Sequence, residues 1–224
     1  MGTWCSNATL LHTGVLFLDE LAEFDRDVLE ALRQPLEEGS VVIARAQGAL
    51  RFPAEVQLVA AMNPCRCGFH GDLDRACTCA PGEPDRYVRR VSGPLLDRLD
   101  LRVEMPRVHP TELLLGPDPE PSPAVAARVA AARAGALARN GGRLNARLTG
   151  RQTVELCRLP ERSRELLALI AARRCLTARG VHRILRVART IADLDGRASV
   201  EDADLLAAAD LRDPSAPARP GLAA

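Results

Sequence analysis

Residues 14–21 read GVLFLDEL, an apolar run that ends in two acidic side chains, Asp19 and Glu20. A short apolar run bounded by turn signals is typical of a strand buried in a parallel sheet. Ligands of such sheets bind beyond the carboxyl ends of the strands. The stretch therefore predicts a buried strand that delivers two carboxylates to a ligand-binding edge, the arrangement known as Walker B.

A Walker B element divides the work of nucleotide hydrolysis between its two carboxylates. Asp19 would hold Mg²⁺, usually through water, and Glu20 would orient and polarise the attacking water. A strand that ends in Asp-Glu is also common by chance. The alternative is a pair of acids that only keeps the edge of the sheet soluble.

The segments around this strand indicate an α/β fold. Their apolar spacing and turn residues predict, in order, a helix over 24–38, a hairpin over 41–52, a strand over 55–62, a helix within 86–96 and a strand over 99–105. Strand, helix, hairpin and strand in this order are typical of an α/β domain. We therefore expect a partial α/β core over 14–115, with an irregular cysteine-rich insertion over 63–84.

A proline-rich stretch separates this core from the rest of the chain. Residues 116–123 read GPDPEPSP, which can form neither helix nor sheet and marks a linker. Helices are predicted downstream over 124–139, 149–156, 162–174, 178–194 and 200–211. The expected second domain is therefore an all-helical lid over 124–212, followed by a disordered tail over 213–224.

The charge distribution follows the same division. All thirty basic residues of the 224 are arginine, and residues 1–121 carry 12 of them against 19 acids. Residues 122–197 carry 16 arginines against 5 acids, a net charge of +11. This basic block could face DNA or nucleotide phosphate. A solvated, arginine-rich helical surface is the alternative.

Compartment and membrane contact are also constrained by the sequence. The longest apolar runs, such as 56–62, are too short to span a bilayer. The first basic residue is Arg26, so a secretory n-region is absent. We therefore expect a cytoplasmic protein without membrane contact, in which cysteines are reduced thiols or metal ligands rather than disulfides.

Two more polar residues stand where a nucleotide site needs them. Asn63 closes the strand predicted over 55–62, and its amide could hydrogen-bond the γ-phosphate or the attacking water, the role called sensor 1. A turn residue that ends a strand is the alternative. Arg98 follows a short helix and could reach a neighbouring subunit as an arginine finger. A salt bridge with Asp97 or Asp100 is the alternative there.

The helix predicted over 178–194 begins with Arg179, which could reach the γ-phosphate from the lid. Arg183, Arg186 and Arg189 follow along the same helix. Each of these arginines, taken alone, is expected at the surface.

Four cysteines lie in the predicted insertion. Cys65 and Cys67 are separated by nine residues from Cys77 and Cys79. Four thiols in one polar loop of a cytosolic protein suggest Zn²⁺, although C-x₂-C is the usual spacing and C-x-C is tighter. Structural or labile thiols are the alternative. The remaining cysteines, Cys5, Cys157 and Cys175, show no partner spacing.

Taken together and in this order, these elements resemble the magnesium-chelatase-like AAA+ ATPases, and most closely their competence-protein ComM (YifB) group. The matching stretches are GVLFLDEL (14–21), LRQPLEEG (32–39), QLVAAMNPCRCG (57–68), SGPLLDRLDL (92–101) and ARGVHRILRVARTIADL (178–194). The resemblance implies an AAA+ α/β core with a helical lid, which uses ATP and Mg²⁺ and assembles with homologous subunits into a hexameric ring. It also implies a DNA motor that promotes branch migration during recombination.

Residue by residue, the resemblance implies Walker B at Asp19 and Glu20 and sensor 1 at Asn63. It implies the arginine finger at Arg98 and sensor 2 at Arg179.

The front of the chain departs from the family pattern. Family members carry a glycine-rich P-loop before the Walker B strand, and its lysine contacts the β- and γ-phosphates. This sequence contains no lysine. We expect residues 1–13 to lie outside the family pattern. We therefore expect a truncated or split product, or a misplaced start, that is inactive alone. The alternatives are a magnesium-chelatase motor subunit for tetrapyrrole metallation and a non-catalytic, zinc-stapled binding fragment.

Overall fold

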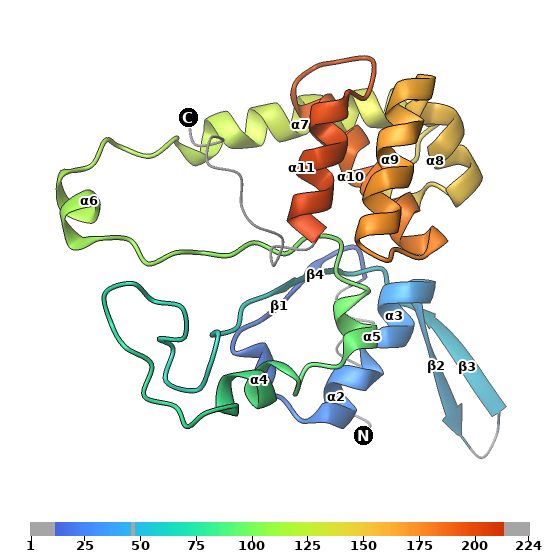
Figure 1. Ribbon diagram of the computed structural model, residues 1–224. Coiled ribbons are helices and arrows are strands. Elements are labelled where there is room, and N and C mark those ends of the chain that lie inside the picture. Colours follow the sequence, from blue (N-terminus) through green and yellow to red (C-terminus); the bar gives the residue numbers. More distant parts are fainter. Residues whose placement is uncertain (1–11, 46–47, 213–224) are drawn as a thin grey trace. The chain divides into compact units, whose positions relative to one another are not determined.

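The computed structural model describes residues 12–45 and 48–212, which form two compact units divided between Leu99 and Asp100 (Figure 1). The predicted tail over 213–224 and Cys5 lie outside the described residues. No helix within the described ranges is both long and apolar enough to cross a bilayer.

The first unit contains a parallel pair of strands (Figure 1). Strand β1 (Val15–Leu18) pairs with β4 (Gln57–Ala60), in a register that sets Leu18 opposite Ala60. The intervening chain forms η1 (Leu21–Glu23), α2 (Arg26–Ala31), α3 (Arg33–Glu38) and the antiparallel hairpin of β2 (Ser40–Arg45) and β3 (Gly48–Pro53). After β4 and a long irregular segment come α4 (Glu83–Val88) and α5 (Gly93–Leu96). The mixed α/β character predicted for this part is confirmed.

The core of this unit lies between the strand pair and the short helices. Its buried members are mostly aliphatic: Leu18, Leu21, Ala22, Leu29, Leu32, Tyr87, Val91 and Leu95. Burying such side chains contributes about 1.5–3 kcal/mol each for the larger ones. Leu18 and Leu21 are both members of this cluster. The turn between them, which carries Asp19 and Glu20, is therefore anchored to the core on both sides.

Three predictions differ in the structure. Helix α7 (Ser122–Arg139) begins inside the stretch over 116–123 that was expected to exclude helix, because a proline is tolerated in the first turn of a helix. The helix over 24–38 is divided at Leu32, since the ring of Pro35 clashes with the carbonyl of residue 31, where α2 ends. The strand predicted over 99–105 is wrong, because no strand of the described residues pairs with it. The exposed Leu101, Val103 and Met105 instead lie in irregular backbone, where the Arg102 amide donates to the Leu211 carbonyl at 2.6 Å.

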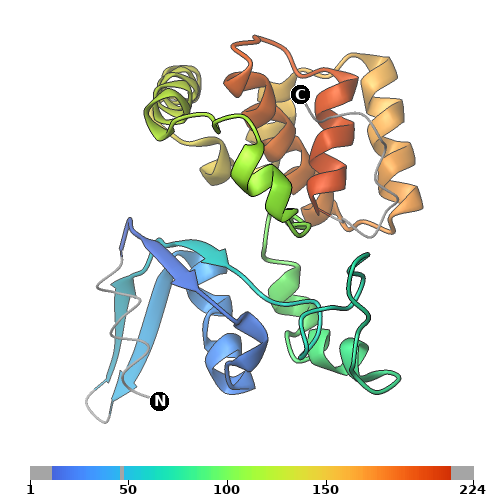
Figure 2. The ribbon, with the colours of Figure 1, turned by 90° about the vertical axis from the view of Figure 1, so that its left-hand side faces the viewer.

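The second unit is helical (Figure 1, Figure 2). It contains α6 (Pro110–Leu115), α7 (Ser122–Arg139), η2 (Asn145–Arg147), α8 (Gly150–Cys157), α9 (Glu161–Arg173), α10 (Ala178–Leu194) and α11 (Asp202–Arg212). Helix α10 is central, because α7, α8, α9 and α11 all pack against it. Its start is capped by Thr177, whose hydroxyl accepts from the amide of Gly180, so the bounds of α10 agree with the prediction.

A buried ionic network ties α7 and η2 to α10. The Asp193 carboxylate, 6% exposed, accepts from Arg139 at 2.9 Å, from the Asn145 amide at 2.8 Å and from Arg189 at 3.1 Å. Burial acts to raise the pKa of Asp193, but the hydrogen bonds of Arg139 and Asn145 and the charge of Arg189 hold it below its ordinary value of 3.8. The carboxylate is therefore ionised at neutral pH and neutralises cations inside the unit.

Asp193→Ala should destabilise the second unit by about 3–5 kcal/mol, because it leaves the guanidinium of Arg189, 1% exposed, buried without its carboxylate. Denaturant unfolding would measure the loss. The wild type should also lose this contribution as the pH falls from 3.8 through the lower folded-state pKa, and the variant should not. Glu155→Ala is the control, since its pair with Arg151 is solvated and should matter little. Equal stability of the two variants would contradict the prediction.

Candidate functional site

The parallel pairing of β1 and β4 brings the polar residues that follow them to one edge. The Ala61 amide donates to the Leu18 carbonyl at 2.9 Å, and the Leu21 amide donates to the Ala61 carbonyl at 2.9 Å. These bonds extend the contact one step beyond the strands. As a result, the turn that carries Asp19 and Glu20 lies beside the segment that leads to Asn63.

Both acids of this turn are exposed, and the backbone of Glu20 is unusual. Glu20 has φ 52° and ψ 47°, the left-handed region that residues other than glycine rarely adopt. Its amide donates to the Asp19 carboxylate at 2.9 Å. Such a conformation costs on the order of 1–3 kcal/mol and is concentrated at functional sites. The turn therefore presents two solvent-accessible carboxylates on a strained backbone.

Arg98 follows α5 and contacts the end of α3. Its guanidinium pairs with Glu37 and donates to the Pro94 carbonyl at 2.6 Å, while its side chain is only 13% exposed. Its Nε has no hydrogen-bond partner among the described residues. Asp100, one of the two partners considered from the sequence, pairs with Arg183 at 3.4 Å. Glu37 was not identified from the sequence, because a contact across 61 residues leaves no spacing signal.

Arg179 belongs to the second unit and lies exposed in the first turn of α10. The expectation that the three following arginines are surface residues is wrong. The side chain of Arg183 is 13% exposed, and burial is the main cause that lowers its pKa. Arg186 donates to the Leu148 carbonyl. Arg189 is fully buried. Its guanidinium donates to the carbonyls of residues 197 and 198 and to Asp193, and these bonds replace the water that burial removes.

The four cysteines of the insertion converge. Their sulfur atoms all lie within 4.8 Å of one another, and Cys65 is buried while the others are half-buried. The Sγ of Cys67 lies 3.3 Å from that of Cys65 and 3.5 Å from that of Cys77. Four sulfurs at about 2.3 Å from a tetrahedral metal lie about 3.8 Å apart. The donor set and its spacing therefore fit a tetrahedral metal site.

The thiols of this cluster differ in acidity. Hydrogen bonds from the backbone amides of Phe69 and Thr78 lower the pKa of Cys67 to about 5. The Cys67 amide acts to lower the pKa of Cys79, but burial and the neighbouring thiols raise it to about 12. A group of adjacent thiolates repels further negative charge, and a divalent cation removes that penalty. Cys157 lies elsewhere, in the core of the second unit, where its thiol donates to the Leu185 carbonyl.

Two family descriptions match the chain one after the other. Residues 5–113 match "Magnesium chelatase, subunit ChlI", and residues 119–212 match "Magnesium chelatase, subunit ChlI C-terminal". The chain therefore belongs to the magnesium-chelatase-like family.

Within this family, the chain is similar to curated proteins that include ComM and YifB. Competence protein ComM of Haemophilus influenzae is 42% identical over 194 residues, which are 86% of this chain and 37% of ComM. YifB of Escherichia coli K12 is 42% identical over 189 residues, 84% of this chain and 37% of YifB. A Mycobacterium tuberculosis protein is 44% identical over 191 residues, with the same shares. The chain thus spans little more than a third of the length of these relatives.

Proposed function

We propose that this chain supplies the hydrolysis and sensing residues of an AAA+ ATPase that remodels DNA by ComM-type branch migration. The carrying observation is the parallel β1–β4 pair, which sets the Asp19-Glu20 turn beside the segment leading to Asn63. The family suggests nucleotide and Mg²⁺ use. Oxygen ligands at the carboxyl edge of a parallel sheet suit a hard cation and phosphate.

Each residue then has a distinct role. Asp19 would hold Mg²⁺ through water, and Glu20 would polarise the attacking water. Asn63 would hydrogen-bond the γ-phosphate or that water. Arg98 would complete the site of a neighbouring, homologous subunit in a hexameric ring, and Arg179 would reach the γ-phosphate from the lid. Such a machine would work on DNA in the cytoplasm.

The lysine that contacts the phosphates must come from outside these 224 residues, since the sequence contains none. We therefore expect the chain alone to hydrolyse ATP at the background rate. A chimera in which residues 14–212 replace the matching segment of ComM should hydrolyse ATP and be stimulated by DNA. A steady-state phosphate-release assay measures both. An inactive chimera that folds and assembles would contradict the proposal.

The same assay separates the second candidate function, a motor subunit for tetrapyrrole metallation. The matched family descriptions name magnesium chelatase, which keeps this candidate open. The NPCRCG stretch at 63–68 resembles the ComM group more than the chelatase proper. Stimulation by a porphyrin and its chelatase partners, and not by DNA, would favour the second candidate.

We also propose that the four converging cysteines hold one Zn²⁺. Thiolate ligands in a tetrahedral arrangement are the usual structural zinc set. Zinc would supply a cross-link between the two ends of the loop from Cys65 to Cys79. A small, polar loop without an apolar core gains most from such a link. A non-catalytic, zinc-stapled binding fragment is the function that would remain if the ATPase proposal failed.

Protein purified under reducing conditions should contain about one zinc per chain, and Cys77→Ser/Cys79→Ser should contain none. The double variant removes two of four ligands, so the remaining pair cannot complete a tetrahedral site. Elemental analysis gives the stoichiometry. Cys157→Ser is the matched control, because this thiol lies in the core of the second unit. The zinc site would be contradicted if the wild-type protein contained no metal and was equally stable with and without a chelator.

A further inference from the structure

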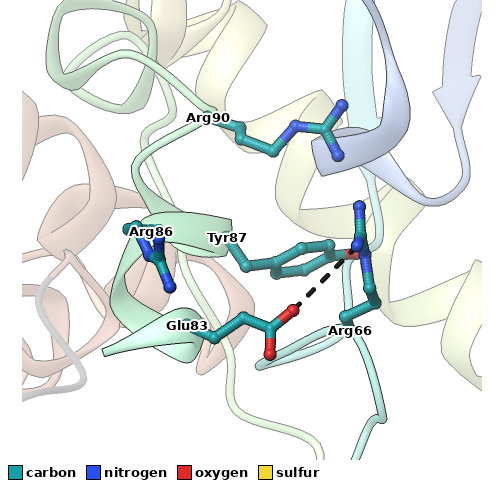
Figure 3. A pocket seen from close by; sticks show the side chains of 5 residues that line it. All are labelled: Arg66, Glu83, Arg86, Tyr87 and Arg90. Atoms are coloured by element: carbon teal, nitrogen blue, oxygen red, sulfur yellow. Dashed lines mark ion pairs between the residues drawn. The ribbon is translucent and has the colours of Figure 1, made fainter. Parts of the chain in front are cut away.

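A pocket of about 250 Å³ lies in the first unit (Figure 3). Three arginines, one carboxylate and one phenol ring line it: Arg66, Arg86, Arg90, Glu83 and Tyr87. Tyr87 is buried, and α4 supplies Tyr87 itself and two of the other four lining residues, Glu83 and Arg86. The pocket is therefore rich in guanidinium groups and contains one aromatic ring.

The ion pairs of the pocket leave two guanidinium groups largely unused. Arg90 pairs with Glu23 at 3.0 Å. Arg66 approaches Glu83 only to 4.0 Å, and that carboxylate already accepts from the Ala80 amide at 3.1 Å. Arg86 donates from Nε to the Gly82 carbonyl at 3.4 Å.

A guanidinium has five N–H donors in a planar fork that matches phosphate and carboxylate. Arg197 of the second unit uses this fork on a carboxylate, since it donates to Asp204 at 2.6 and 2.8 Å. Arg66 and Arg86 both line the pocket, from opposite sides of the Tyr87 ring, and neither holds a carboxylate at close hydrogen-bond distance there (Figure 3). A phosphate group offers the several acceptor oxygens that these donors need.

The cysteine cluster fixes one of the two arginines. Arg66 lies between Cys65 and Cys67, whose sulfur atoms are 3.3 Å apart. The backbone of Arg66 therefore cannot move without displacing two candidate metal ligands. The other arginine, Arg86, comes from α4, which begins four residues after Cys79.

We propose that this pocket binds a phosphate group through Arg66 and Arg86, and that metal binding by the cysteine cluster holds Arg66 in place for it. The phosphate belongs either to the backbone of a single-stranded nucleic acid or to a free phosphate compound. The metal part rests on the proposed zinc site, whereas the phosphate pocket stands on the arginines alone. Neither part requires the chain to hydrolyse ATP.

The test compares Arg66→Ala/Arg86→Ala with Arg89→Ala in the full chain, using a labelled single-stranded oligonucleotide. Arg89 is exposed on the same segment but does not line the pocket, so it controls for the loss of one charge, and the single variants Arg66→Ala and Arg86→Ala are each compared with it. The double variant should bind at least about tenfold more weakly than the control. Its plot of log affinity against log salt should also be shallower by about 0.7 for each lost phosphate contact. Zinc content, measured in parallel, should not change.

Competition separates the two sources of phosphate. If inorganic phosphate displaces the oligonucleotide only through its ionic strength, as chloride does, the site is for nucleic-acid backbone. If inorganic phosphate displaces the oligonucleotide at a lower ionic strength than chloride does, the site is for free phosphate. This difference between the two anions should be absent from the Arg66→Ala/Arg86→Ala variant. Equal affinity and equal salt slope for the double variant and the Arg89→Ala protein overturn the proposal. So does the absence of any binding to either probe.

The metal part is tested with Cys77→Ser/Cys79→Ser and with chelator-treated wild type. Both should lose affinity about as much as the arginine double variant, while Cys157→Ser should not. Unchanged affinity after proven metal removal overturns the metal's role and leaves the pocket. A wild type that contains no metal overturns the zinc site, and the arginine variants then still decide the pocket.

Discussion

If the proposed ring forms, a YifB variant that lacks the arginine aligned with Arg98 should hydrolyse ATP faster when this chain is mixed in. In an AAA+ ring each nucleotide lies between two subunits, and one supplies the P-loop while its neighbour supplies the finger. Under the proposed function, this chain would supply Arg98 in the second role. A finger changes the rate by about 10³–10⁵ where it is supplied or removed. Even rare mixed interfaces should therefore be visible above background.

Two variants of the added chain separate the finger from other effects. Arg98→Ala should restore nothing, because the guanidinium that stabilises the transferring phosphoryl group is missing. Asp19→Asn should restore as much as the wild type, since the chain's own nucleotide edge is not used at that interface. Phosphate release in mixed rings is the measurement, and co-sedimentation shows whether each variant enters them.

The contact between Arg98 and Glu37 makes this test informative. The guanidinium is only 13% exposed and is held by Glu37 and the Pro94 carbonyl. A purely structural salt bridge would explain the same contact. If the Arg98→Ala chain still enters rings and restores as much hydrolysis as the wild type, Arg98 is only a structural salt-bridge partner. Its proposed role as an arginine finger is then wrong.

Elements defined by local sequence could be predicted closely. The bounds of α10 follow from the Thr177 cap and from apolar residues that recur at helical spacing. The positions of β1 and β4 follow from short apolar runs ended by turn residues, but the predicted burial is wrong, because Val15, Phe17 and Val59 are exposed on this two-stranded sheet. The break at Leu32 also had a local signal, Pro35, whose effect on residue 31 was not considered.

Elements that depend on distant partners could not be predicted. The run over 99–105 has strand-like composition, but a strand needs a neighbour for its backbone hydrogen bonds, and the described residues offer none. Arg189 lies on the helix like its exposed neighbour Arg179. Its burial depends on the carbonyls of residues 197 and 198, which fold back onto it after the helix ends, and Asp193 one turn along the same helix neutralises its charge.

The candidate sites show the same limit. The cysteine cluster was identified because its ligands come in two close pairs, which is a pattern visible in sequence. The two contacts of arginines in the first unit were missed. Arg98 pairs with Glu37 from another helix, and Arg66 and Arg86 line one pocket although they are 20 positions apart, so neither placement has a characteristic spacing.

In the ComM chimera, Glu20→Gln should lower kcat for ATP hydrolysis by about 10²–10⁴, the usual contribution of a positioned general base. The amide keeps the size of the side chain but cannot polarise water in the same way. KM for ATP should change little, since the group acts in the transition state. Asp27→Asn is the control, because it removes a nearby exposed acid outside the strained turn. Steady-state kinetics that do not distinguish the two variants would remove Glu20 from the catalytic role.

The left-handed backbone of Glu20 gives a second, independent readout. Glycine adopts φ near 52° without a steric penalty, so Glu20→Gly should relieve strain at this turn. Hydrolysis by the chimera should fall as far as in Glu20→Gln, while the melting temperature should rise relative to Glu20→Gln, which keeps the strain. If Glu20 served only to stabilise the turn, Glu20→Gly would instead lower the melting temperature relative to Glu20→Gln. Greater stability together with lost hydrolysis would show that the strain is tolerated for the sake of the carboxylate.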